Sequence, residues 1–164
     1  MGAVASVIAF FSVIALGLSA GALLAGGAIL VPFWRSLPPE SFLGWYREHA
    51  SLLQRFFGPL QIAAFALAAI AAALRWFVRG SASPFFVLAA LLAFAVLVAF
   101  PLYFERVNGS FAAGTIAPVR VAEELRRWSS WHWVRTIIAT AAFIVAVTAL
   151  LVRQNRGVSE LSQA

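Results

Sequence analysis

Hydrophobic residues dominate four stretches of the chain, each long enough to cross a bilayer. These stretches lie at residues 4–31, 56–77, 85–103 and 132–152 of 164. A helix of about 18 or more apolar residues spans the roughly 30 Å hydrocarbon core of a membrane. We therefore predict an all-α integral membrane protein, an antiparallel four-helix bundle whose single domain covers residues 1–152. Residues 153–164 are predicted to form a polar, mobile tail.

The first stretch is predicted to be a retained span. Ala20-Gly21-Ala22 resembles a signal-peptide cleavage site, but no basic residue precedes the apolar run, which continues to Val31. Gly17 and Gly21 have the GxxxG spacing that lets helix backbones approach closely. We expect this pair to serve packing inside the bundle, with self-association as the alternative.

Amphipathic helical segments are predicted to lead into the second and fourth spans. Proline is tolerated in the first turn of a helix, so one helix is expected to start near Pro38-Pro39. Its aromatic and apolar residues then recur at helical spacing from Phe42 to Phe56. A second helical pattern begins after Pro118 and runs into the fourth span. Between the third span and Pro118, the turn dipeptide Asn108-Gly109 predicts a loop.

Composition supports a bilayer as the main partner. Hydrophobic residues make up 63% of the chain, the mean hydropathy is +0.92 and the formal charge is +6. The cations are scattered at segment ends and form no dense basic face, so no nucleic-acid partner is expected. A count of basic residues places the two long connections, before the second and fourth spans, in the cytoplasm. The chain has no cysteine, which excludes thiolate chemistry from its own side chains.

Candidate chemistry gathers where the fourth span begins. Glu124, Trp128, His132 and Arg135 share one face of the predicted helix. Imidazole titrates near neutrality, so His132 is a candidate for proton transfer or haem ligation, or else an interfacial side chain bonded to a backbone carbonyl. Arg135 either binds an oxyanion through its planar donors, or reaches for headgroups or a glutamate.

Other polar side chains lie on the same predicted side of the membrane. His49, Glu105 and Asn108 could meet His132 in a polar cluster under aromatic side chains, although each also has a structural interpretation. Haem held by His49 and His132 is an alternative, but no cofactor is firmly implied and no short-range metal-ligand spacing is present. Tryptophans near span ends are typical of an aromatic belt. Of these, Trp128 and Trp131 are candidates to line a pocket for a flat aromatic ligand.

Three sequence elements together resemble a known family. They are Gly21 followed by Pro32, then Asn108-Gly109-Ser110-Phe111-Ala112, then Trp128-Ser129-Ser130-Trp131-His132-Trp133-Val134-Arg135. This pattern resembles the anthrone-oxygenase-like family of small four-span membrane proteins, largely a domain of unknown function. The resemblance extends roughly from residue 17 to residue 151 and implies, for some members, oxidation of an anthrone to an anthraquinone.

Carried over to this chain, the resemblance implies catalytic roles for His132, Arg135 and Asn108, and substrate contacts by Trp128 and Trp131. His49 and Glu105 join the substrate-binding candidates through the polar cluster. In the implied mechanism His132 takes a proton from the substrate, Arg135 or Asn108 stabilises the oxyanion, and the carbanion reacts with oxygen.

Function remains open between two classes at this stage. The first is an oxidoreductase of oxygenase type that oxidises or binds an aromatic, quinone-like molecule at one membrane face. The second is a non-enzymatic accessory or structural subunit of a larger membrane complex or homo-oligomer. No nucleotide-binding loop, hydrolase triad or zinc signature supports an ATPase or a hydrolase, and no charged residue at mid-membrane supports a transporter.

Overall fold

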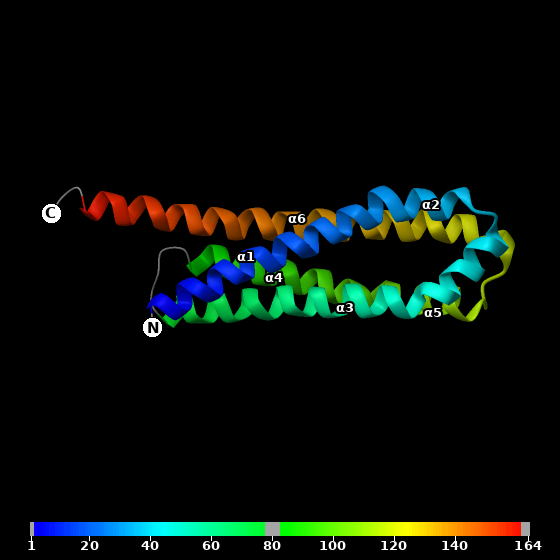
Figure 1. The fold of residues 1–164 in the computed structure, drawn as a ribbon, viewed down its shortest axis with the longest axis horizontal. Coiled ribbons are helices and arrows are strands. Elements are labelled where there is room, and N and C mark those ends of the chain that lie inside the picture. The colour runs from blue at the N-terminus through cyan, green and yellow to red at the C-terminus, as the bar shows by residue number, and fades with distance from the viewer. Residues whose placement is uncertain (1, 78–82, 162–164) are drawn as a thin grey trace.

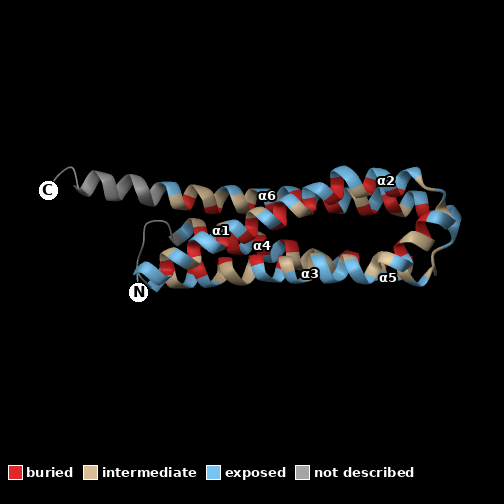
Figure 2. Ribbon diagram, in the orientation of Figure 1, coloured by how far each residue is buried: buried red, intermediate tan, exposed pale blue. Residues whose placement is uncertain are grey.

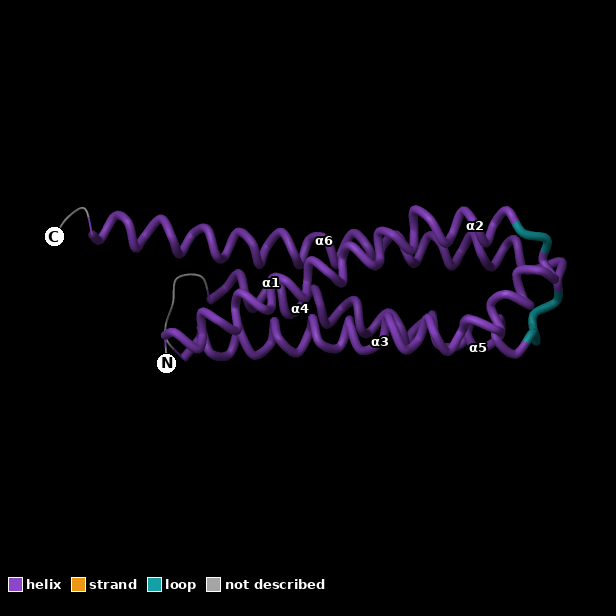
Figure 3. The backbone as a smooth tube through the Cα atoms, viewed as in Figure 1, coloured by secondary structure: helices purple, strands orange, loops and turns teal. Residues whose placement is uncertain are grey.

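The chain forms a bundle of long helices (Figure 1). The computed structural model describes the backbone of residues 2–77 and 83–161, with side chains at 2–77 and 84–151. The elements are α1 (Gly2–Ala25), η1 (Gly26–Leu30), α2 (Val31–Ser36), α3 (Pro39–Phe77), α4 (Ser83–Ala99), η2 (Phe100–Phe104), α5 (Glu105–Ala113) and α6 (Pro118–Leu161). Elements η1 and η2 are π-helical. Within the described ranges, only residues 37–38 and 114–117 are not helical (Figure 3).

The predicted membrane bundle is confirmed. Among the described residues, four helical segments are long and apolar enough to cross a membrane: Gly2–Ser36, Pro39–Phe77, Pro84–Ala113 and Pro118–Leu151. The four long helices pack in the cyclic order α1, α3, α4, α6, so each contacts two neighbours. Successive helices run in opposite directions along the bundle (Figure 1).

Both amphipathic lead-ins are continuous with the spans that follow them. Helix α3 starts at Pro39 and α6 at Pro118, as the proline positions predict. In the first turns of α3, Phe42 and Tyr46 are buried against the bundle, while Phe56 is 57% exposed. The start of α3 therefore packs over the end of the bundle, whereas the apolar side chain of Phe56 further along points away from the bundle.

The loop predicted at Asn108-Gly109 is wrong, because both residues lie inside α5. Phe111 on the same helix is fully buried, and its packing outweighs the local preference of the dipeptide for a turn. The chain instead turns at Gly114, which has a left-handed φ of 64° and ends α5. The N–H of Thr115 donates to the carbonyl of Ser110 and closes the last turn.

The carboxy-terminal tail begins inside a helix. Helix α6 continues to Leu161, past residue 152 where the fourth span was predicted to end. Residues 162–164 lie outside the described residues. The mobility of the 153–164 segment stays a prediction.

Buried residues line the inside of the bundle along its length (Figure 2), but their chemistry differs between its two ends. Toward the end where α1 begins, the buried residues are mostly alanines, such as Ala68, Ala89 and Ala146, which allow the helices to approach closely. Gly17 belongs to this tight packing, because a Cβ placed there would lie 3.0 Å from the Phe143 ring, whereas Gly21 has nothing within 4 Å. Only Gly17 of the GxxxG pair thus meets another helix closely.

Toward the other end, the buried residues are mainly aromatic. Trp34, Phe42, Tyr46, Phe104 and Trp128 belong to one cluster of buried residues there. Trp34 contacts Phe42, Tyr46 and Trp128 with ring centroids 5.3–5.9 Å apart. Rings of this size require more space between helices than alanines do.

Two proline positions accompany the π-helical segments. Pro32 follows η1 and Pro101 lies within η2, and proline both lacks an N–H and clashes with the carbonyl four residues earlier. A wider turn relieves that clash. Consistent with π geometry, the N–H of Val31 donates to the carbonyl of Gly26, and the N–H of Glu105 to that of Phe100. These irregular turns lie beside the cavity described next.

Candidate functional site

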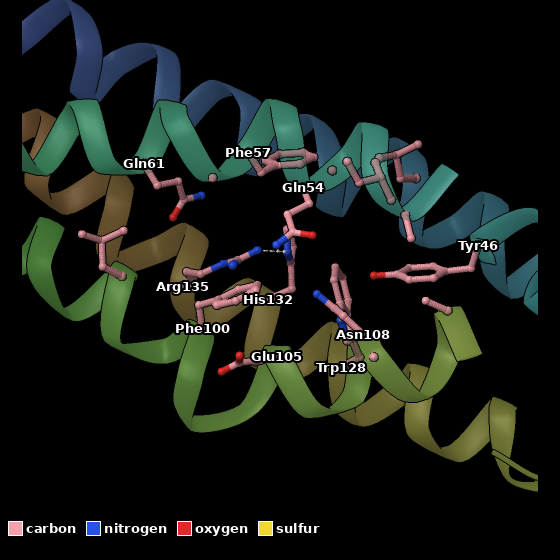
Figure 4. A pocket seen from close by; sticks show the side chains of 18 of the residues that line it. Tyr46, Gln54, Phe57, Gln61, Phe100, Glu105, Asn108, Trp128, His132 and Arg135 are labelled. Carbon is pink, nitrogen blue, oxygen red and sulfur yellow. Dashed lines mark hydrogen bonds between the residues drawn. The ribbon is translucent and has the colours of Figure 1, made fainter. Parts of the chain in front are cut away.

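A cavity of about 500 Å³ lies between the alanine-rich and aromatic parts of the core. Its lining comes from η1, α2, α3, α4, η2, α5 and α6 (Figure 4). Along α3 the lining extends from Tyr46 to Ile62, and the stretch from Tyr46 to Gln61 covers roughly 22 Å at 1.5 Å per residue. Its size is that of a small-molecule site, and it crosses the level at which the apolar spans begin.

His132 lies at the centre of this cavity and is 2% exposed. Its Nε2 lies 2.8 Å from the carbonyl oxygen of Leu23, and its Nδ1 lies 3.2 Å from Nη2 of Arg135. A carbonyl can only accept and a guanidinium can only donate. The hydrogen bonds therefore require the neutral tautomer, in which Nε2–H donates to Leu23 and Nδ1 accepts from Arg135.

Neighbouring residues fix the plane of the imidazole. The ring stacks on Trp128 with centroids 4.8 Å apart and planes at 11°. On the other side it meets η1, where a Cβ on Gly26 would lie 3.3 Å from Nε2 and one on Gly27 3.2 Å from Cδ2. The Gly26-Gly27 pair thus leaves the space through which the ring reaches Leu23.

Arg135 brings a positive charge into the protein interior. The residue is 8% exposed, and its Cζ lies 4.2 Å from the centroid of Phe104, a cation–π contact. Its Nε has no hydrogen-bond partner, and no carboxylate of the described residues forms an ion pair with it. A buried cation without an anion is costly, which makes this side chain a candidate for binding a ligand oxygen.

Asn108, Trp128 and Glu105 complete the polar part of the lining. The indole N–H of Trp128 donates to Oδ1 of Asn108 over 2.8 Å, which fixes both side chains and leaves the Asn108 amide nitrogen for a ligand. Glu105 is the only carboxylate among the described lining residues. Glu124, a sequence candidate for pairing with Arg135, instead accepts a hydrogen bond of 2.7 Å from the hydroxyl of Tyr103.

Two of the sequence candidates lie away from the cavity. Trp131 is 39% exposed and stacks on Tyr103 with centroids 5.3 Å apart. His49 stacks on Trp45 with centroids 4.3 Å apart, and its Nδ1–H donates to the Trp45 carbonyl over 2.8 Å. Neither residue belongs to the lining. The two imidazoles do not face a common space, so the described residues do not fit a haem held by both histidines.

Sequence reasoning missed most of the remaining lining residues, among them Trp34, Tyr46 and Gln61. Gln61 is 7% exposed and lies inside the second apolar stretch, where a lone polar side chain was a usable signal. Tyr46 is 4% exposed and points into the cavity (Figure 4). Trp34 was assigned to the aromatic belt, but it is 3% exposed and packs inside.

Comparison with known proteins identifies the family of the chain. No curated protein and no solved structure matches the chain. The sequence pattern that defines the anthrone oxygenase family matches residues 48–145, a range that contains most of the cavity lining, including Gln61, Glu105, Asn108, His132 and Arg135. This match covers more than half of the chain, and the protein therefore belongs to the anthrone oxygenase family.

Proposed function

We propose that the cavity binds an anthrone-like aromatic molecule and that the protein oxidises it with molecular oxygen. In this reaction the ring methylene loses both hydrogens and gains one oxygen atom, which becomes the second ketone of an anthraquinone. The other oxygen atom leaves with the two hydrogens as water. The four electrons released by carbon are those that reduce O₂, so no other oxidant is required.

The observation that carries this proposal is the buried guanidinium of Arg135 beside an aromatic-lined cavity. Removing a proton from the methylene of an anthrone places negative charge on the ring oxygen opposite. A preorganised donor aimed at that oxygen stabilises the anion most where water is excluded. Arg135 is 8% exposed and lacks an anionic partner among the described residues, so it meets both conditions.

His132 acts in this proposal through Arg135. Both of its ring nitrogens are engaged, one by Leu23 and one by Arg135, so neither offers a free lone pair to a substrate proton. We therefore assign His132 the task of positioning the guanidinium, in place of the general-base role that the family resemblance implied. The stacked Trp128 holds the ring in the plane that this requires.

Glu105 is the candidate proton acceptor. It is the only carboxylate among the described lining residues, and it extends from α5, across the cavity from α3 (Figure 4). The carboxylate takes one methylene proton while Arg135 receives the oxyanion. The electron-rich ring anion then reacts with O₂, a small apolar molecule that dissolves well in the bilayer.

The test is turnover of anthrone by purified protein in lipid nanodiscs. We expect anthraquinone to form faster than in protein-free discs, with one O₂ consumed per product. Glu105→Gln should lower the rate by about 100-fold, the scale of general-base catalysis. The matched control is Glu123→Gln, an exposed carboxylate on α6 outside the cavity lining.

Two outcomes would contradict the proposal. One is a rate equal to that of protein-free discs, which would leave a protein that binds ligand or serves as an accessory subunit. The other is a Glu105→Gln protein that turns over as fast as Glu123→Gln, which would remove Glu105 as the base.

A further inference from the structure

Three buried N–H donors in the cavity lining have no acceptor among the residues that the structure describes. They are Nε1 of Trp34, Nε2 of Gln61 and Nε of Arg135. Buried polar groups in folded proteins are nearly always hydrogen-bonded, so each exception requires an explanation. In three residues that line one cavity, the common explanation is an acceptor that arrives with a ligand.

Two of these donors lie toward the same end of the cavity, called here its inner end (Figure 4). Gln61 comes from α3 and Arg135 from α6, and both side chains point into the space between those helices (Figure 4). They are 7% and 8% exposed, so neither donor is satisfied by bulk water. Ile62, the next residue after Gln61, and Leu97 also belong to the lining and are apolar.

The third donor lies toward the other end of the cavity. Trp34 is 3% exposed and contacts Tyr46 and Trp128 in the aromatic cluster. The Asn108 amide, bonded through its oxygen to Trp128, lies on the same side of His132 as Tyr46 (Figure 4). The cavity therefore presents donors at both ends and aromatic rings between them.

We propose that the inner end is a subsite for an oxygen acceptor, and that Gln61 is a ligand-binding residue there. The ligand it takes is a flat aromatic molecule with a carbonyl or oxyanion directed at Gln61 and Arg135, and with further oxygens at its opposite edge. This proposal rests on the proposed function, because it orients the same substrate. A hydrocarbon of the same shape leaves the buried donors unpaired and is rejected.

Binding experiments test this assignment without turnover. The protein in lipid nanodiscs is titrated with dihydroxyanthraquinone and with anthracene, and binding is followed by quenching of tryptophan fluorescence against empty discs. The parent should bind the quinone and bind anthracene at least about tenfold more weakly. Gln61→Leu should weaken quinone binding about tenfold, the scale of one hydrogen bond, and leave anthracene binding unchanged or improved.

A second variant changes the charge at position 61 while keeping the size of the side chain. Gln61→Glu is nearly isosteric, but it places a carboxylate in the cavity that can pair with Arg135. We expect it to abolish quinone binding while the protein stays folded, as judged by size-exclusion and thermal unfolding. Ser12→Ala is the matched control. Like Gln61, Ser12 has a buried polar atom without a partner among the described residues, but it lies outside the cavity lining.

The outcomes separate this inference from the proposed function. Quinone affinity that is unchanged in both Gln61 variants would overturn the subsite, even if anthrone turnover were observed. Equal affinity of the parent for anthracene and quinone would overturn it as well. Selective quinone binding that both Gln61 variants lose would support the subsite even in a protein without turnover.

Discussion

Replacing Arg135 with methionine separates a ligand-binding cation from a structural one. In the ligand-free protein the variant loses a cation–π contact with Phe104, worth about 2 kcal/mol when desolvated, and a hydrogen bond to His132, worth roughly 1.5 kcal/mol. It also removes the desolvation penalty of a buried cation, several kcal/mol in real proteins, and an unpaired Nε that costs about 1–3 kcal/mol. We therefore expect the free energy of unfolding to change by less than about 2 kcal/mol, or to rise.

Ligand binding should respond in the opposite way. A hydrogen bond from a charged donor contributes about 1.5–3 kcal/mol, so Arg135→Met should weaken dihydroxyanthraquinone binding by roughly 10- to 100-fold. The assays are thermal unfolding of the ligand-free protein in detergent and fluorescence titration in nanodiscs. Arg126→Met is the matched control, because Arg126 is an exposed arginine on the same helix outside the cavity lining.

A purely structural arginine would give a different pattern. A cation held in a buried ion pair costs about 3–5 kcal/mol to remove. If Arg135→Met destabilised the ligand-free protein by that amount while the Arg126 control did not, Arg135 would serve the fold. Unaltered quinone binding in a folded Arg135→Met protein would refute the binding role directly.

Three further substitutions test the surroundings of the site. Gly27→Ala places a Cβ 3.2 Å from Cδ2 of His132, so we expect the free energy of unfolding to fall by about 1 kcal/mol and quinone binding to weaken. A variant equal to the parent in both measurements would show that the close approach is dispensable. In Gly114→Ala the new Cβ would sit on a residue with a left-handed φ of 64° and would collide with the side chain of Arg47. We expect the free energy of unfolding to fall by about 1–2 kcal/mol. An unchanged melting temperature would contradict this prediction. Trp131→Phe changes a ring outside the cavity, so quinone affinity should stay at the parent level, and a large loss would place Trp131 at the site after all.

Much of the fold could be predicted from the sequence, because the length of an apolar stretch and the position of a proline each determine local structure. The apolar stretches predicted the membrane helices, and Pro39 and Pro118 begin α3 and α6 as expected. The dipeptide Asn108-Gly109 misled, since its turn preference is weaker than the packing of the buried Phe111 on the same helix. The π-helical turns beside Pro32 and Pro101 were also missed, although proline inside an apolar run was the available signal.

The site could be predicted only where helix periodicity alone determines which side chains share a face. Spacing on one helix placed Trp128, His132 and Arg135 on a common face, and the structure turns that face inward. Contacts between helices carry no such signal, so the bond from His132 to the Leu23 carbonyl could not be foreseen. That bond matters for the chemistry, because it holds the proton on Nε2 and leaves the lone pair on Nδ1, where Arg135 donates to it.

The distribution of the other aromatic and polar residues shows the same limit. His49 and Trp131 lie near span ends like the true lining residues, yet each stacks on a neighbour outside the cavity. Gln61 was overlooked because one amide inside an apolar stretch does not interrupt the hydrophobic pattern. Its burial and its unpaired Nε2 emerge only from the packing of α3 against its neighbours.

An experimental structure of the protein with dihydroxyanthraquinone bound in nanodiscs would test the role of the cavity directly. We expect ring density in the cavity beside His132, with one ligand oxygen within hydrogen-bond distance of Arg135 and Gln61. A cavity filled by a lipid chain, or ligand density on the outer surface of the bundle with Arg135 unchanged, would contradict it.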